Sequence, residues 1–240
     1  MGQTLGRYSA RAVYRALTIG ARWPLVALPA ARRLGHGVVV TPATRLVIEG
    51  FPRSGNSAAV AGFLAAQPEP VEVAHHTHAP ANVLAGVRGR IPVLLVARHP
   101  REATTEFVLT KPALTVGDAL VGYVRFHAPL VRARRRFLVA TTDEILADLG
   151  SVVSRLNAKF GTSFARPIAV TENDARTKAA VERYWASREG PGLPLVGRTT
   201  AAAPPDPDAA ARLGTDYEAS RLTARRVAAE RLYTLLTGRS

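Results

Sequence analysis

The stretch LVIEGFPRSGNSAAVAGFLAAQ, residues 46–67, decides the fold that this sequence predicts. Its apolar, β-branched start at 46–48 is typical of a buried strand. Its end, residues 56–66, is rich in alanine and apolar on nearly every helical face, which predicts a buried helix. A short loop that contains serine and glycine joins the two. A strand, a tight loop and a buried helix in this order indicate an α/β protein.

The loop is close to the Walker A phosphate-binding pattern, G-x-x-x-x-G-K-[ST]. Gly50, Gly55 and Ser57 occupy the two glycine positions and the hydroxyl position of that pattern. Asn56 stands where the pattern requires the lysine that reaches the β- and γ-phosphates. The loop is therefore either a defective nucleoside triphosphate site or a site for a different phosphate ligand.

Further apolar runs predict buried strands at 93–96 and 137–141, and a shorter run predicts one at 71–73. Helices are expected at 101–109, at 116–136 with a kink at Pro129, at 143–160 and at about 216–237, and residues 191–207 are expected to form a surface loop. Strands that alternate with helices predict a parallel sheet flanked by helices. In such sheets, ligands bind at the carboxyl ends of the strands.

The composition of the 240 residues, 47% hydrophobic and 21% charged, is ordinary for a globular protein. The sequence has no cysteine, which excludes a disulfide scaffold, thiol chemistry and cysteine-based zinc sites, and fits a cytoplasmic location. The net charge of +14 indicates either a surface for an anionic partner or the codon usage of a GC-rich genome. No basic stretch has interleaved aromatic residues, so a nucleic-acid partner is not expected.

Residues 1–40 are predicted to form a basic helical segment, and residues 41–240 the α/β domain. Arg15 and Arg22 interrupt the apolar run of this segment, so it does not have the pattern of a signal peptide. Two interpretations stay open. We expect a helix that packs on the domain with its arginines on the surface; the alternative is a basic amphipathic helix in peripheral contact with a membrane.

A loop between a strand end and a helix N-terminus can hold a phosphate without the Walker lysine. Backbone N–H groups that have no helical partner point at the ligand, and the positive end of the helix dipole favours negative charge. Gly55 lets the backbone approach closely, the hydroxyls of Ser54 and Ser57 can donate, and Arg53 can supply the cation. The alternative is an ordinary strand–turn–helix connection that binds no ligand.

Two further segments give this loop a context. The predicted strand at 93–96 is followed by Arg98-His99-Pro100-Arg101-Glu102, and the stretch between the two strands contains Thr77-His78-Ala79-Pro80. Together with Pro52-Arg53-Ser54-Gly55-Asn56-Ser57, these segments resemble the sulfotransferase family. The resemblance covers roughly residues 45–165, and the order of the segments along the chain matches the family as well.

The resemblance implies a sulfotransferase fold, which is similar to that of P-loop NTPases. The activity it implies is transfer of a sulfuryl group from 3′-phosphoadenosine 5′-phosphosulfate to a hydroxyl or amine of a small-molecule, lipid or carbohydrate acceptor. The implied donor-binding residues are Arg53, Ser54, Gly55, Asn56 and Ser57 for the 5′-phosphosulfate, Arg98 and the position of Glu106 for the 3′-phosphate, and Arg188 for a late loop that closes over the donor. The family has a serine where this chain has Glu106.

Three of the six histidines, His75, His76 and His78, lie together in the sequence. Their spacing is compatible with a metal site, with surface or capping histidines, or with a catalytic base. The resemblance implies that His78 is the base, and a histidine near neutral pKa can accept a hydroxyl proton. We therefore expect His78 and Arg53 to be catalytic, with Arg53 neutralising charge on the departing phosphate, and we expect no metal.

Two other functions stay open on the sequence alone. One is a nucleotide kinase or NTPase, against which the missing Walker lysine speaks. The other is a non-catalytic, sulfotransferase-like protein that binds an anionic membrane surface. Glu106 is its support, because a carboxylate is a poor neighbour for a phosphate.

Overall fold

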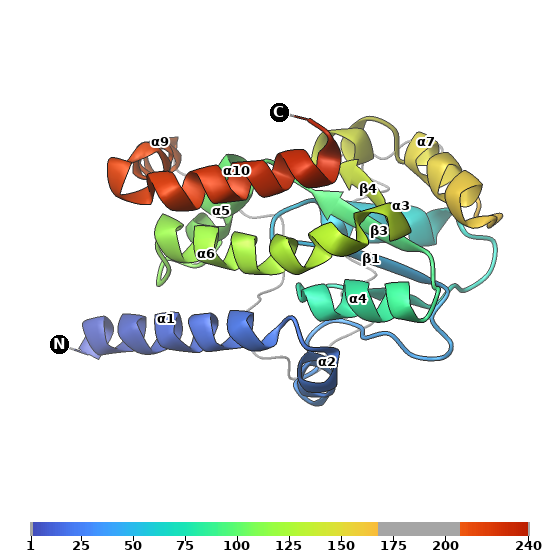
Figure 1. Ribbon diagram of the computed structural model, residues 1–240, viewed down its shortest axis with the longest axis horizontal. Helices are drawn as coiled ribbons and strands as arrows, with labels where there is room; N and C mark the ends of the chain where they lie inside the picture. The colour runs from blue at the N-terminus through green and yellow to red at the C-terminus, as the bar shows by residue number, and fades with distance from the viewer. Residues whose placement is uncertain (1, 168–206, 240) are drawn as a thin grey trace.

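The computed structural model describes residues 2–167 and 207–239. Its centre is a sheet of four parallel strands in the order β2-β1-β3-β4 (Figure 1). The strands are β1 (Leu46–Gly50), β2 (Val73–His75), β3 (Val93–Ala97) and β4 (Leu138–Thr141). Helices pack on both faces of the sheet, so the predicted α/β architecture with a parallel sheet flanked by helices is confirmed.

The two faces of the sheet bury two separate apolar cores. Val47, Val93 and Leu95 face a larger core that includes residues of α4 (Pro80–Arg88), α6 (Val116–His127) and α10 (Thr223–Thr237). Ile48 and Leu94 face a smaller core that is covered by α3 (Asn56–Ala66) and α7 (Thr142–Phe160). Because the central strands are buried on both faces, their sequences are continuous apolar runs rather than alternating ones.

Several predicted elements have the expected limits. Helix α3 spans the predicted residues, and α5 (Pro100–Thr110) and α7 begin one residue before their predicted starts. The start of α7 is fixed by a capping box, in which the Thr141 side chain accepts from the Glu144 amide and the Glu144 side chain accepts from the Thr141 amide.

Other elements differ from the predictions. Strand β2 begins at Val73 rather than Val71, and α4 was not expected. The helix predicted at 116–136 is α-helical only to His127 and continues as a 3-10 helix, η1 (Ala128–Arg136), because Pro129 lacks the amide donor that an α-helix needs. The helix predicted at 216–237 covers α10, a 3-10 turn, η3 (Ser220–Leu222), and only the end of α9 (Pro207–Glu218), most of which was not expected.

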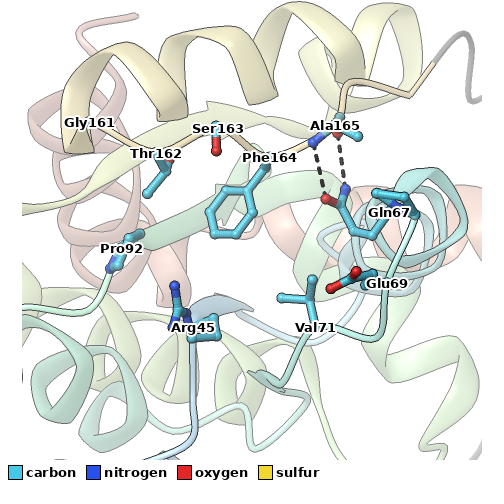
Figure 2. Close-up of a pocket in the computed structure, with 11 residues that line it drawn as sticks. Arg45, Gln67, Glu69, Val71, Pro92, Gly161, Thr162, Ser163, Phe164 and Ala165 are labelled. Carbon is cyan, nitrogen blue, oxygen red and sulfur yellow. Dashed lines mark hydrogen bonds between the residues drawn. The ribbon is translucent and has the colours of Figure 1, made fainter.

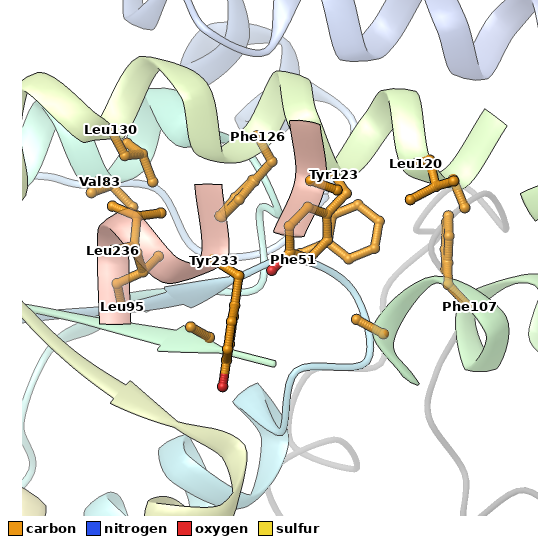
Figure 3. Packing of buried hydrophobic residues seen from close by; sticks show 14 of the residues in the cluster. Phe51, Val83, Leu95, Phe107, Leu120, Tyr123, Phe126, Leu130, Tyr233 and Leu236 are labelled. Carbon is orange, nitrogen blue, oxygen red and sulfur yellow. The ribbon is translucent and has the colours of Figure 1, made fainter. Parts of the chain in front are cut away.

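Phe51, the first residue after β1, anchors the following loop to the larger core. Its side chain is 2% exposed. The ring centroid lies 5.2 Å from that of Tyr123 and 5.7 Å from that of Phe107, so aromatic rings of α6 and α5 surround it (Figure 3). This packing fixes the direction in which the chain leaves β1.

The N-terminal segment forms two helices, α1 (Gly2–Gly20) and α2 (Pro24–Arg33). Helix α1 lies along α6, on the side opposite α10 (Figure 1). After α2, Val38 forms an isolated antiparallel bridge with His75 at the outer edge of β2. Among the described residues, no helix is both long and apolar enough to span a membrane.

His127 is a polar residue in the larger core. Its side chain is fully buried, and its Nδ1 lies 3.0 Å from the carbonyl oxygen of Tyr123. Because a carbonyl only accepts, Nδ1 carries the proton, and Nε2 is buried without a hydrogen-bond partner among the described residues. Burial lowers the pKa of His127 from 6.5 to about 4.

The depressed pKa of His127 predicts a loss of stability in mild acid. The folded state holds the ring neutral, so its contribution is present above pH 6.5 and is lost as the pH falls towards about 4. The full loss is at most about 3 kcal/mol at 1.36 kcal/mol per pKa unit. We expect the free energy of unfolding of His127→Phe, measured with denaturant at pH 7.5 and 4.5, to fall less than that of the wild type. An equal fall in both proteins would contradict this assignment.

Candidate anion-binding site

The order of the strands brings the two predicted ligand segments together. The chain passes from β1 to β2 in one direction along the sheet and from β3 to β4 in the other, so the direction reverses between β1 and β3. Ligands of open parallel sheets bind in the crevice at the carboxyl ends of two such strands. The loop at 51–55 follows β1, and Arg98 follows β3.

The loop after β1 has the backbone geometry of a tight turn into a helix. Arg53 and Gly55 have positive φ angles of 68° and 82°, and Gly55 is the N-cap of α3. A left-handed conformation is unfavourable for arginine and costs roughly 1–3 kcal/mol, which the surrounding structure has to offset. The first turn of α3 directs backbone N–H groups without helical partners towards the carboxyl end of the sheet.

Asn56 does not take the place of the Walker lysine. Its side chain is 4% exposed, and its Nδ2 donates to the carbonyl oxygen of Gly50 at 3.1 Å. The amide therefore closes the loop from within instead of extending towards a ligand. Gly50 is required at this point, because a Cβ atom there would lie 2.4 Å from the carbonyl oxygen of Val96.

Arg53 and Arg98 form one cationic pair. Nη1 of Arg98 donates to the carbonyl oxygen of Arg53 at 3.0 Å, across 45 residues of sequence. Tyr123 holds the backbone of Arg98 in turn, since its hydroxyl donates to the Arg98 carbonyl at 2.8 Å. Both arginine side chains are 23% exposed, so an anion in solution can reach them.

The cationic pair contacts a carboxylate of the protein itself. Oε1 of Glu106 lies 2.5 Å from Nη2 of Arg98, and Oε2 lies 3.5 Å from Nη2 of Arg53. The hydroxyls of Thr104 and Thr105 donate back to carbonyl oxygens of α5, at 2.6 and 2.8 Å. Glu106 is therefore a direct partner of both predicted phosphate-binding arginines.

Polar atoms without partners are concentrated in the loop. Of the four buried side-chain polar atoms that lack a hydrogen bond in the described part of the chain, three are Nε of Arg53, Oγ of Ser54 and Oδ1 of Asn56. Native proteins satisfy most buried polar groups, and exceptions call for an explanation such as a bound ligand. Arg53 Nε and Ser54 Oγ can donate, so these two are compatible with an anion held by this loop, whereas Asn56 Oδ1 only accepts.

His78 lies against the same loop. Its Nδ1 is 2.8 Å from the carbonyl oxygen of Gly50, so Nδ1 carries the proton and the lone pair of Nε2 remains to accept another. Burial lowers the pKa of His78, and the hydrogen bond to Gly50 opposes this effect in part. The ring is thus neutral near pH 7, as a general base requires.

His75 and His76 have other contacts. Nε2 of His76 lies 3.0 Å from Oγ of Ser57, and its Nδ1 lies 2.8 Å from Nδ1 of His75. Both nitrogens of His76 are therefore engaged, and the side chains of both residues are buried. Residues 2–167 and 207–239 contain no group of three or more His, Cys, Asp or Glu side chains placed to hold a metal ion.

Glu49 organises the histidine segment. The carboxylate is fully buried and accepts from the amide and hydroxyl of Thr77 at 2.8 and 2.6 Å, from the amide of His78 at 3.2 Å and from Asn82 Nδ2 at 3.0 Å. Burial raises the pKa of Glu49, and these hydrogen bonds lower it in part. His76 and His78 have positive φ angles of 56° and 48°, so Glu49 holds a segment whose backbone is strained.

The structural role of Glu49 was not predicted, although the sequence contains a signal for it. A charged residue in the apolar run LVIEG, which is predicted to be buried, needs nearby hydrogen-bond donors. Arg188, predicted to close over a donor, lies outside the described residues, as does most of the loop predicted at 191–207.

A hollow of about 530 Å³ lies at the other end of the sheet (Figure 2). The hollow is lined by Arg45 and Pro92, among other residues, and by Val71 and Phe164. Arg45 is the residue before β1, and Pro92 is the residue before β3. Gln67 closes one side through two hydrogen bonds to the backbone of Ala165, at 3.0 and 3.1 Å. The hollow is at the amino ends of the strands and contains none of the predicted site residues.

No protein-family model and no curated protein matches this sequence. Among solved structures, the chain is similar to mouse sulfotransferase SULT7A1, which was crystallised in complex with PAP. The match has a TM-score of 0.41 and 12% sequence identity, and it covers 84% of this chain and 87% of that chain.

The contacts of Glu49 predict that its replacement destabilises the protein. In Glu49→Gln, an N–H₂ group replaces one of the two carboxylate oxygens that accept hydrogen bonds in the wild type. At least one buried donor then loses its acceptor, which costs about 1–3 kcal/mol. We expect a loss of that size in the free energy of unfolding, measured with denaturant at pH 7. Glu72→Gln, at an exposed carboxylate, is the matched control, and we expect it to change stability by less than about 0.5 kcal/mol. Equal stability of the two variants would show that the Glu49 contacts are not stabilising.

Proposed function

We propose that this protein is a sulfotransferase that uses 3′-phosphoadenosine 5′-phosphosulfate as its donor. The observation that supports this proposal best is the cationic pair of Arg53 and Arg98. The two arginines come from the two segments that resemble sulfotransferase loops, and both contact one carboxylate. In this proposal, the pair would bind a doubly phosphorylated ligand across the crevice between β1 and β3.

The loop after β1 is the proposed site for the 5′-phosphosulfate. Backbone N–H groups at the start of α3, together with the Ser54 and Ser57 hydroxyls, would hold the phosphate oxygens. Arg53 would neutralise the charge that grows on the bridging oxygen as the phosphate leaves. Arg98 would contact the 3′-phosphate, and we keep Arg188 as a proposed donor residue on the resemblance alone.

The proposed step is a direct transfer. Nε2 of His78 takes the proton from the acceptor hydroxyl or amine, and the acceptor atom forms a bond to sulfur. The bond between sulfur and the bridging oxygen breaks, and adenosine 3′,5′-bisphosphate leaves with that electron pair. The acceptor is a small molecule, a lipid or a carbohydrate. The cytoplasm is the proposed location, since a chain without cysteine fits a reducing compartment.

A second candidate function is supported by Glu106. Its carboxylate already pairs with both arginines, so the protein could be a non-catalytic relative whose site stays closed to phosphate. A nucleotide kinase is less well supported, because Asn56 stands in the lysine position and points back to Gly50. Binding of the bisphosphate distinguishes these functions.

Calorimetric titration with adenosine 3′,5′-bisphosphate, without magnesium, tests donor binding. We expect the wild type to bind. Arg53→Ala should weaken binding roughly ten- to a hundredfold, because a charge-assisted hydrogen bond is worth about 1.5–3 kcal/mol. Glu106→Gln should tighten it, because a carboxylate at ~4 Å from a phosphate charge costs about 1 kcal/mol in water and about 4 kcal/mol at an effective dielectric of 20.

The matched control for this titration is Arg101→Ala. Arg101 is a more exposed arginine at the start of α5, with 55% of its side chain accessible, and its removal should leave the affinity nearly unchanged. If the wild type and Glu106→Gln both fail to bind the bisphosphate, the sulfotransferase proposal is wrong. If only Glu106→Gln binds, the closed, non-catalytic function is the correct one.

The assignment of His78 as the base predicts a split between binding and turnover. His78→Ala should reduce bisphosphate release from the donor, assayed with a panel of phenols and amines, by roughly 10²–10⁴-fold, while bisphosphate affinity changes little. Burial lowers the pKa of His78 below 6.5, so the ring stays neutral and able to accept a proton at pH 6.5 and above. Activity should therefore decline only when the pH falls below 6.5. His76→Ala is the comparison; if it alone abolishes turnover, the base is misassigned.

A further inference from the structure

Exposed apolar side chains are concentrated on the two N-terminal helices. Of the nine large apolar residues that are exposed in the described part of the chain, six lie between residues 13 and 26. They are Val13, Leu17, Ile19, Trp23, Leu25 and Val26, and we call them the N-terminal apolar face. Leu25 is 91% exposed and Val26 59%, which is far more than incidental exposure of a core residue.

Two arginines of α1 pair with a buried carboxylate on α6 and remain partly exposed. Nε of Arg11 lies 2.7 Å from Oδ2 of Asp118, and Nη2 of Arg15 lies 2.6 Å from Oδ1 of the same buried carboxylate on α6. Ala12 and Ala16 are on the exposed side of the helix. Helix α1 packs on α6, and 31% of the Arg11 side chain and 53% of the Arg15 side chain stay exposed. The sequence did not predict that both arginines pair with a buried carboxylate.

The charged residues of the N-terminal segment are all arginines. Residues 1–48 contain seven arginines and no Asp, Glu or Lys. Arg22, Arg32 and Arg33 are exposed, and the guanidinium of Arg22 stacks 4.1 Å above the ring of Trp23. Exposed apolar side chains that include a tryptophan, in a segment whose charged residues are all arginines, are complementary to an anionic lipid surface.

We propose that α1 and α2 dock the protein on an anionic bilayer, with the N-terminal apolar face inserted at the level of the headgroups. Leu25 and Val26, at the start of α2, enter the acyl boundary, and Arg22, Arg32 and Arg33 contact lipid phosphates. The helices lie on the membrane and do not cross it. A second copy of the chain is a poorer partner for this face, because two segments that contain only basic charges would repel each other.

The docked surface adjoins the candidate active site. The amide of Ala81 donates to the carbonyl oxygen of Ala21 at 3.1 Å, which ties the turn between α1 and α2 to the start of α4. His78 lies three residues before Ala81 in the same segment. Docking would therefore bring the histidine loop close to the membrane, where an amphiphilic acceptor would be found.

Vesicle sedimentation with the full chain tests the docking. We expect binding to vesicles of phosphatidylcholine with phosphatidylglycerol, little binding to phosphatidylcholine alone, and a decrease as salt is raised. Arg32→Glu/Arg33→Glu should weaken binding by about 30-fold or more, at roughly fivefold for each arginine removed from the surface. Leu25→Glu should weaken it at least about tenfold.

The control and a second readout locate the contact. Val227→Glu changes an equally apolar residue on α10 that is 53% exposed, and it should bind vesicles like the wild type. In a Trp185→Phe background, Trp23 is the sole tryptophan, and anionic vesicles should shift its emission to the blue.

Two results would overturn the proposal. One is vesicle binding that Leu25→Glu and the arginine variant leave unchanged. The other is a chain that ignores vesicles but forms dimers that Leu25→Glu dissociates in sedimentation velocity, since a second copy would then cover this face. Neither readout uses the sulfuryl donor. Membrane docking can therefore be disproved while the proposed sulfotransferase activity is confirmed, and the activity can be disproved while docking is confirmed.

Discussion

The carbonyl oxygen of Gly50 is the point at which the sheet, the loop and the histidine segment meet. It accepts from Asn56 at the start of α3 and from His78 after β2, and Gly50 itself pairs with Val96 of β3. Because a side chain at this position would collide with the Val96 carbonyl, only glycine allows all three contacts at once. The position of the candidate base relative to the arginine pair follows from this one residue.

The backbone fold was largely predictable from local patterns. Strands β1, β3 and β4 are short apolar runs, which predict buried strands. Helix α3 is apolar on nearly every side, which predicts a buried helix. Helix α4 was missed and β2 was misplaced, and two further errors lie where a helix changes its type or ends. Pro129 converts an α-helix into a 3-10 helix, and the turn at 220–222 divides a helix whose sequence gives no strong signal for a break.

The site was predictable only in part, because its decisive contacts are made between distant segments. The residues of the loop and Arg98 could be named from their motifs, and the parallel topology brings them together. The partners of Glu49 lie 28–33 residues away, and the two arginine partners of Asp118 lie 103–107 residues away, so no local pattern reveals these contacts. The pairing of Arg11 and Arg15 with Asp118 was therefore not predicted, although Arg15 lies on the surface as expected.

The bridge between Val38 and His75 has a consequence for the edge of the sheet. Strand β2 is only three residues long, and one of the three pairs with Val38 through hydrogen bonds of 2.8 and 2.9 Å. An open edge strand is a template on which another molecule can add a strand and start aggregation. The segment after α2 covers part of this edge, so the chain that leaves the N-terminal helices also protects the sheet against self-association.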